Sequence, residues 1–248
     1  MEVFRAIAVS LAPRIDFSRL LVFALLAAAL ALGGCASTRP MAYGPDPASV
    51  KDASKQPIYL MTMTVKNPFK TYYLPAMKSL GVVRGDGKAD GDKFGFAPDE
   101  PAKNEMNTDA DGNRYFLRLP LDAGKPHRIH QVFFMASKFP VNGMFFLPLN
   151  AELPAAEPGV YYLGHVEASV RERKENEFRA GGVLPLLDQS LSGASGGTWD
   201  VAISDRWDSD EKLFRERFPA MGTAAVKKAI LPPFDRERAQ REWDNPPK

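Results

Sequence analysis

Alternation of apolar and polar side chains is the feature that most restricts the fold of this chain. Between residues 160 and 170 one side of the alternation is apolar or small, at Val160, Tyr162, Gly164, Val166, Ala168 and Val170. Residues two apart lie on the same face of a β-strand. The pattern therefore predicts a strand with one buried face, and residues 198–204 repeat it with Trp199, Val201 and Ile203 directed inward.

Several other segments have the composition of strands. The run at 58–65 is apolar on both faces, which predicts a strand buried on both sides. Residues 114–121 turn through Asp-Ala-Gly-Lys-Pro into 127–135, a pattern typical of a β-hairpin. Shorter strands are predicted at 80–84 and 143–149. The stretch 85–112 is dense in Asp, Gly, Lys and Pro, so we expect a long exposed connection there.

Helix is predicted only in the C-terminal quarter. Asp208 with Glu211 three residues later resembles a capping box, and the helix should end before Pro219. A second short helix is predicted at 224–231. From Asp235 onward, charges of both signs predict a frayed or loosely docked tail.

Seven or so short strands followed by one or two helices predict a mainly β fold. We expect an antiparallel β-sandwich, Ig-like or transthyretin-like, over 57–204, with a C-terminal helical appendage and charged tail over 205–248. The segment from Arg114 to Val170, with its Ala-Gly-Lys-Pro turn and its Pro-Gly-Val-Tyr-Tyr strand start, resembles transthyretin-like and carboxypeptidase-regulatory-like domains. The resemblance concerns topology only, and it implies a structural or binding module.

The first 34 residues have the pattern of a secretion signal. Arginines at 5, 14 and 19 precede the uncharged run from Leu20 to Leu32, which is shorter than the roughly 20 residues that span a bilayer. The run ends in Leu32-Gly33-Gly34-Cys35, which resembles the lipobox of bacterial lipoproteins. The resemblance implies cleavage before Cys35 and lipidation of its thiol. Ala36 after the cysteine resembles what outer-membrane lipoproteins carry.

These features predict where the protein is found. We expect a lipid anchor in the outer membrane of the cell envelope, with the domain facing the periplasm and residues 35–56, rich in proline, acting as a tether. Cys35 is the only cysteine, so neither an intrachain disulfide nor a cysteine-based zinc site can form. The expected partners are the membrane, through the lipid, and an envelope protein.

Charge and composition exclude other classes of function. With 32 Lys and Arg against 30 Asp and Glu, the chain lacks the basic excess that nucleic acid selects. No cofactor and no metal site are predicted. We therefore expect a structural or interaction role without catalysis.

A serine hydrolase is one alternative, because Gly193-Ala-Ser195-Gly-Gly197 has the G-x-S-x-G form of a nucleophile elbow. The elbow requires a helix after the serine, whereas a strand is predicted there. All three histidines also precede Ser195, which is the wrong order for an α/β-hydrolase.

A weak Ca²⁺ or small-ligand module is the other alternative. Asn107-Thr-Asp109-Ala-Asp111-Gly112 is similar to the first half of an EF-hand loop, but Arg118 stands where the closing glutamate belongs. A simple Asp-Gly turn also explains the segment.

Histidines and paired aromatic residues complete the candidates. His127 and His130 fall on opposite faces of a strand, which excludes a joint metal site there. His165 and Glu167 share a face and could form a polar pair, although we expect isolated, exposed side chains. The doublets Phe133-Phe134, Phe145-Phe146 and Tyr161-Tyr162 put a ring on each face of a strand. These rings could line a ligand groove, although aromatic residues in strands more often fill a core. One member of each doublet is either exposed to a partner or covered by the C-terminal helix.

Overall fold

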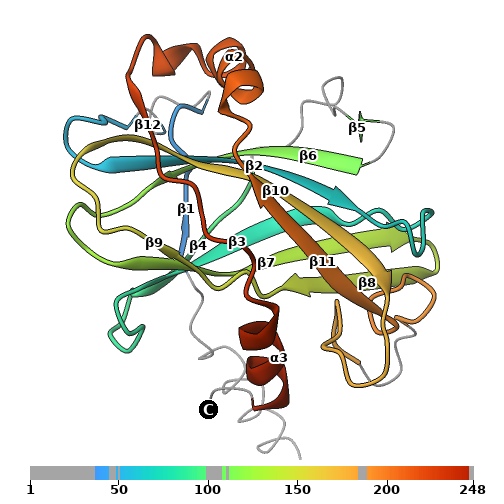
Figure 1. Ribbon diagram of the computed structural model, residues 1–248. Helices are drawn as coiled ribbons and strands as arrows, with labels where there is room; N and C mark the ends of the chain where they lie inside the picture. Colours follow the sequence, from blue (N-terminus) through green and yellow to red (C-terminus); the bar gives the residue numbers. More distant parts are fainter. Residues whose placement is uncertain are drawn as a thin grey trace, which may run out of the picture. The chain divides into compact units, whose positions relative to one another are not determined.

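Two six-stranded sheets make up most of the computed structural model (Figure 1). The structure describes residues 37–44, 49, 51–98, 108–109, 112–183 and 189–245. Cys35, Asp111 and the predicted signal peptide lie outside these residues. No helix in the described ranges is long and apolar enough to cross a membrane.

The first sheet, sheet A, has the strand order β1, β4, β3, β7, β8. Its strands are β1 (Ser37–Arg39), β4 (Lys93–Phe96), β3 (Ala76–Arg84), β7 (His127–Lys138) and β8 (Val141–Leu147), and β9 (Ala151–Leu153) also pairs with β7. Neighbouring strands are antiparallel except β1 and β4, which are parallel.

The second sheet, sheet B, has the order β11, β10, β2, β6, β5. Its strands are β11 (Gly197–Ser204), β10 (Gly159–Glu172), β2 (Pro57–Lys66), β6 (Gly112–Pro120) and β5 (Thr108–Asp109), and β12 (Val226–Lys228) pairs with β10. Strand β10 is parallel to both β2 and β12. The mainly β prediction is confirmed, but both sheets are mixed and not antiparallel. In sheet A the parallel pair is β1 with β4, and in sheet B the chain passes through sheet A between β2 and β10 and returns in the same direction.

The predicted hairpin between residues 114–121 and 127–135 is wrong. Strand β6 pairs with β2 and β5 in sheet B, whereas β7 pairs with β3, β8 and β9 in sheet A. The turn between them therefore links the two sheets, and the hairpin partner of β7 is β8. The connection predicted at 85–112 contains the short strand β4, which pairs with β3.

The facing sides of the two sheets form one hydrophobic core. Sheet B contributes Met61, Leu117 and Val166, all fully buried, and sheet A contributes Val132 and Leu147. The Trp199 ring lies between the sheets, with ring centroids 5.5 Å from Phe134 and 6.2 Å from Phe145.

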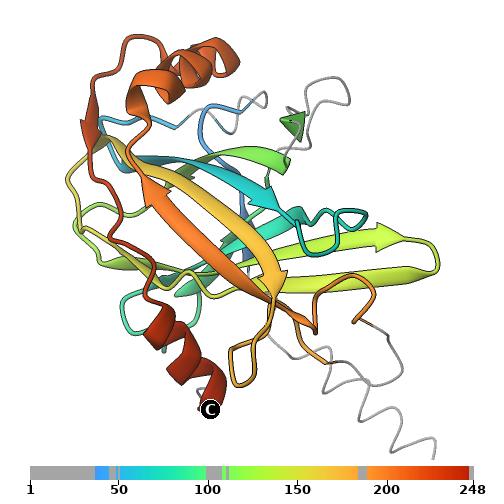
Figure 2. The ribbon, with the colours of Figure 1, turned by 45° about the vertical axis from the view of Figure 1, so that its right-hand side comes forward.

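The other face of sheet B is covered by a helical layer. Helix α2 (Trp207–Arg217) and the 3-10 turn η2 (Pro219–Met221) pack against Ile58, Leu60 and Tyr162 through Phe214 and Met221. Figures 1 and 2 show α2 on the side of sheet B that faces away from sheet A. Strand β2 is thus buried on both faces, as its uniform apolar run predicts.

Helix α2 ends before Pro219 as predicted, but it begins differently. Arg206 is the N-cap residue and makes no side-chain capping bond. The Asp205 carboxylate instead accepts a hydrogen bond from the Trp207 amide at 3.0 Å. The predicted capping box of Asp208 and Glu211 therefore does not form, because Asp208 lies inside the first turn.

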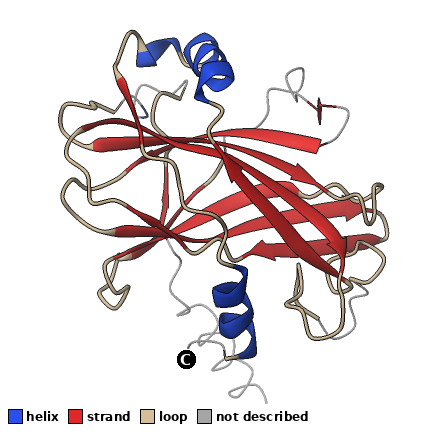
Figure 3. Ribbon diagram, in the orientation of Figure 1, coloured by secondary structure: helices blue, strands red, loops and turns tan. Residues whose placement is uncertain are grey.

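The C-terminal segment is more ordered than predicted (Figure 3). The helix expected at 224–231 is instead β12 and an extended strap, whose Ala229 and Leu231 amides donate to the Tyr162 and Leu163 carbonyls of β10. Where a frayed tail was expected, α3 (Arg236–Asp244) forms. The Asp235 side chain caps it by accepting from the Arg238 amide.

The segment predicted to be a tether packs onto the domain in part. The compact unit begins at Ser37, whose strand β1 pairs with β4. Met41, Ala42 and Tyr43 are buried, and the Ala42 amide donates to the Arg118 carbonyl at the edge of β6. The N-terminal segment thus runs from the edge of sheet A to the edge of sheet B.

A bulge at Gly164 divides β10. Gly164 has φ +106°, and the register with β2 shifts between Tyr162 and His165. Val160 and Tyr162 therefore face α2, whereas Val166 faces the core between the sheets. The sequence predicts one continuous buried face from residue 160 to residue 170. In the structure this alternation belongs to two half-strands, whose apolar residues point to opposite faces of sheet B.

Candidate functional site

A carboxylate buried under α2 collects polar groups from three strands. Asp210 is completely buried. Its Oδ2 accepts hydrogen bonds from the Thr62 hydroxyl at 2.5 Å and the Tyr162 hydroxyl at 2.7 Å. Its Oδ1 forms an ion pair with Arg114 Nη2 at 2.5 Å. One residue of α2 is therefore bound to β2, β6 and β10 together.

His165 extends this cluster. The Thr62 hydroxyl gives its single proton to Asp210, so His165 Nδ1, 2.8 Å away, must be the donor to Thr62. Nε2 is then an acceptor, and this buried atom has no hydrogen-bond partner among the described residues. Burial, with a further contribution from the charge of Arg206, lowers the pKa of His165 to about 4.

The cluster is chemically closed. Burial, reinforced by the hydrogen bond and negative charge of Asp210, raises the pKa of Tyr162, so Tyr162 stays a neutral donor. Three donors occupy Asp210. This arrangement holds the helix on the sheet, and the lone pair left on His165 Nε2 is buried.

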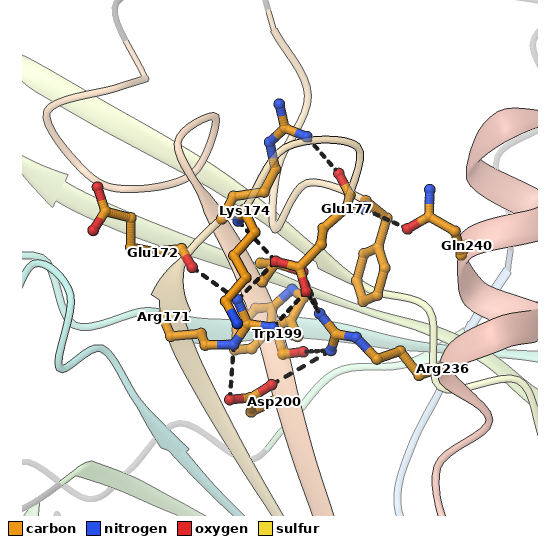
Figure 4. A network of polar contacts seen from close by, with 11 residues as sticks. Arg171, Glu172, Lys174, Glu177, Trp199, Asp200, Arg236 and Gln240 are labelled. Atoms are coloured by element: carbon orange, nitrogen blue, oxygen red, sulfur yellow. Dashed lines mark hydrogen bonds and ion pairs between the residues drawn. The ribbon is translucent and has the colours of Figure 1, made fainter.

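A second polar network fixes α3 (Figure 4). Glu177 Oε1 accepts from Arg171 at 2.6 Å and from Arg236 at 2.9 Å, and Asp200 binds both arginines. The hydrogen bonds from Arg171 hold the pKa of Glu177 far below its usual range. Arg236 also donates to the Trp199 carbonyl at 2.6 Å, so α3 is attached to the end of β11.

Exposed apolar side chains gather where β7 turns into β8. Phe139 in this turn is fully exposed, and Tyr72 is 66% exposed. The Lys138 ammonium lies 3.9 Å from the centre of the Tyr72 ring. We call Tyr72, Lys138, Phe139 and the half-exposed Leu191 the aromatic tip.

Contacts between loops hold the aromatic tip together. Asn67 donates to the carbonyls of Tyr73, at 2.6 Å, and Ser192, at 3.1 Å, which joins the loops that carry Tyr72 and Leu191. Ser192 in turn lies against Gly143 of β8, where a Cβ atom would meet the serine Oγ. The tip is therefore mounted on sheet A and does not hang on a single loop.

The structure places Ser195 in a turn, not in a nucleophile elbow. Strand β11 follows Ser195, and the Ser195 carbonyl accepts a hydrogen bond from Arg179. The three histidines bond elsewhere: His127 to the Lys125 carbonyl, His130 to Asn150 and His165 to Thr62. No described hydrogen bond joins the Ser195 side chain to any of them.

The remaining predicted candidates are not brought together. Asp109 belongs to β5 and pairs with Gly112 of β6. Within the described ranges no group of three or more His, Cys, Asp or Glu side chains could hold a metal ion. Glu167 forms ion pairs with Lys66 and Arg206, and His165, expected at the surface, is only 1% exposed.

Each aromatic doublet divides its rings as predicted. Phe134 and Phe145 fill the core, while Phe133 and Phe146 stack on the outer face of sheet A at 5.1 Å. Tyr162 lies under α2, with its ring 4.9 Å from Trp207. The covered outcome therefore occurs at Tyr162, whereas Phe146 on the outer face of sheet A stays partly exposed.

Sequence reasoning missed the buried cluster around Asp210. A weak signal exists in β2, where Thr62 and Thr64 interrupt an apolar run on the face that carries Ile58 and Leu60. Buried hydroxyls of this kind need partners. Nothing in the local sequence shows that Asp210 supplies one.

No protein-family model, curated protein or solved structure matches this chain. The function is therefore argued from its own residues.

Proposed function

We propose that the chain is a lipid-anchored protein of the bacterial cell envelope, with a structural or interaction role and no catalysis. The observation that carries the proposal is the sequence Leu32-Gly33-Gly34-Cys35 at the end of an apolar export segment. The acyl chains on Cys35 would hold the protein in the outer membrane, with the domain on the periplasmic side.

The N-terminal boundary of the folded domain supports this proposal. Strand β1 begins at Ser37, two residues after Cys35. Two residues of extended chain span at most about 7 Å. The domain would therefore lie directly at the lipid surface. The long tether expected over 35–56 is not needed in this arrangement.

We also infer that the two packed sheets act as a β-sandwich scaffold that presents loops and strand turns. Their common core supports this inference. The closed cluster at Asp210 and the separate bonding of the three histidines favour a binding or structural module over a serine hydrolase using Ser195.

Replacement of the anchoring residue tests the proposal. In the native host, Cys35→Ser should abolish incorporation of labelled palmitate and leave the export segment uncleaved. Ser37→Ala, exposed and outside the lipobox, is the matched control and should be acylated normally. Mass spectrometry of the wild-type protein should show a lipidated first residue at position 35. An unmodified Cys35, or a different first residue, would contradict the proposal.

A further inference from the structure

The aromatic tip exposes three large apolar side chains carried by neighbouring loops. Phe139 is completely exposed, Tyr72 is 66% exposed and Leu191 is 52% exposed. Single exposed apolar residues are common, but a cluster of them marks a surface that meets a protein or a lipid. The tip is held by the β7–β8 hairpin and by Asn67, so its exposure is a stable property of the fold.

The charge of the tip favours lipid. The segments 67–73, 137–142 and 189–193 contain Lys70 and Lys138 but no Asp or Glu, although the chain as a whole has 30 acidic residues. Lysine is depleted in protein interfaces, whereas aromatic rings beside lysine are typical of the membrane–water interface. The Lys138 ammonium lies over the Tyr72 ring, so a ring inserted at headgroup depth would bring this charge to the lipid phosphates.

The tip and the N-terminal strand lie at opposite ends of sheet A. Ser37 pairs with Phe94, which is in register with Val82 and, through it, with Ile129 of β7. From Ile129 the strand continues to Lys138, a distance of about 30 Å at the usual rise per residue. A contact at each end would lay the strands of sheet A along a surface.

We propose that the aromatic tip inserts into the headgroup region of an anionic bilayer, the same bilayer that holds Cys35. The choice of this bilayer rests on the proposed function. Because Ser37 follows Cys35 by only two residues, the domain would be attached to the bilayer at two points about 30 Å apart, the lipid on Cys35 and the aromatic tip. The strands of sheet A would then run roughly parallel to the membrane surface. Helix α2 covers the face of sheet B that is turned away from sheet A, so it lies away from the line that joins the two contacts.

The sole native cysteine makes a direct test practical. When Cys35 carries lipid, a cysteine introduced by Phe139→Cys is the only free thiol, and it can carry an environment-sensitive fluorophore. Asp208→Cys on α2 is the matched control, because Asp208 is also fully exposed. Each labelled lipidated protein is reconstituted in phosphatidylethanolamine–phosphatidylglycerol vesicles that contain lipids spin-labelled near the headgroup.

The label at 139 should shift to shorter wavelength and be quenched several-fold more than the label at 208. Adding Lys138→Glu should reduce the ratio of inserted to free tip on the order of tenfold, because each basic residue contributes to attraction by anionic lipid. Equal quenching at both positions, or a label at 139 that stays in water, overturns the proposal. A label at 139 that stays in water would indicate that the tip binds a protein and not lipid.

Failure of the anchor is recognised separately. Mass spectrometry of the same sample shows whether Cys35 carries lipid. If it does not, the proposed function fails and Cys35 is a second free thiol, so both labelled variants are remade with Cys35→Ser and mixed with the same vesicles. Greater quenching at 139 than at 208 then still supports lipid contact by the tip, and equal quenching still overturns it.

Discussion

Removal of the Asp210 carboxylate should be one of the most damaging single changes on the surface of sheet B that α2 covers. Asp210 is completely buried, and its two oxygens accept from Thr62, Tyr162 and Arg114. In Asp210→Ala all three donors lose their acceptor at once. The two hydroxyls are buried, so water cannot readily replace the lost partner.

The expected loss follows from these contacts. A buried donor left without an acceptor costs about 1–3 kcal/mol, and breaking a buried ion pair from one side costs about 3–5 kcal/mol. The two contributions overlap because the groups act as one cluster, so they do not add. The Arg114 side chain is 14% exposed and can recover some hydration. We expect the free energy of unfolding to fall by about 3–5 kcal/mol.

Urea unfolding followed by tryptophan fluorescence measures this loss, because Trp207 lies in α2. Asp208→Ala is the matched control: its side chain is fully exposed on the same helix, and it should change stability by no more than about 0.5 kcal/mol. Asp210→Asn, which keeps the shape but not the charge, should fall between the two. A loss below about 1 kcal/mol for Asp210→Ala would show that the cluster does not hold α2 on the sheet.

Three further changes test other parts of the fold. Because burial lowers the pKa of His165 to about 4, the unfolded state takes up a proton before the folded state does. Stability should therefore fall by about 1.5 kcal/mol between pH 6.5 and pH 5, and His165→Asn should remove this part of the slope in urea titrations. Arg236→Met should speed amide hydrogen exchange throughout α3 and cost about 1–2 kcal/mol, whereas Arg241→Met on the exposed side of the same helix should change neither. Gly164→Ala should lower the unfolding free energy by about 2–3 kcal/mol, and Gly85→Ala by about 1 kcal/mol. Both glycines have positive φ, but only at Gly164 would the Cβ atom also lie 3.0 Å from the Ser204 carbonyl oxygen. Equal thermal shifts for the two variants would contradict this account.

Strand positions could be predicted from the sequence because alternation is a local property. The segments around Val166, Val201 and Leu117 are strands as expected. Strand partners could not be predicted in the same way. The turn between β6 and β7 has hairpin composition, yet β6 pairs with β2 in one sheet and β7 with β3 in the other, partners that lie far from the turn in the chain.

The ends of the domain were mispredicted for a related reason. Residues 41–43 and helix α3 have little apolar periodicity of their own, and they are ordered by contacts with distant strands. Two local features of the sequence indicate α3: Asp235 is a favourable N-cap residue, and Arg238 and Glu242 are four residues apart, the spacing of a helical ion pair. The mixed charges of this segment led us to predict a frayed tail instead.

The candidate sites were accessible to sequence reasoning to different degrees. The exposed Phe139 lies in a short turn between two predicted strands, so its exposure could be inferred from topology. The Asp210 cluster could not, since Thr62 and Asp210 are 148 residues apart and nothing local links them. Long-range polar contacts of this kind leave almost no trace in a single sequence.

The parallel pairing of β2 with β10 at the centre of sheet B also determines when the molecule can fold. Thr62 and His165, on these adjacent strands, are 103 residues apart in the chain. A pairing with such a separation must close a large loop before any favourable contact compensates for the lost entropy, so we expect slow folding. During synthesis from the N-terminus, β2 would lack its partner β10 until residue 172 has been made. Under the proposed function, this delay would favour passage of the still unfolded chain through an export channel.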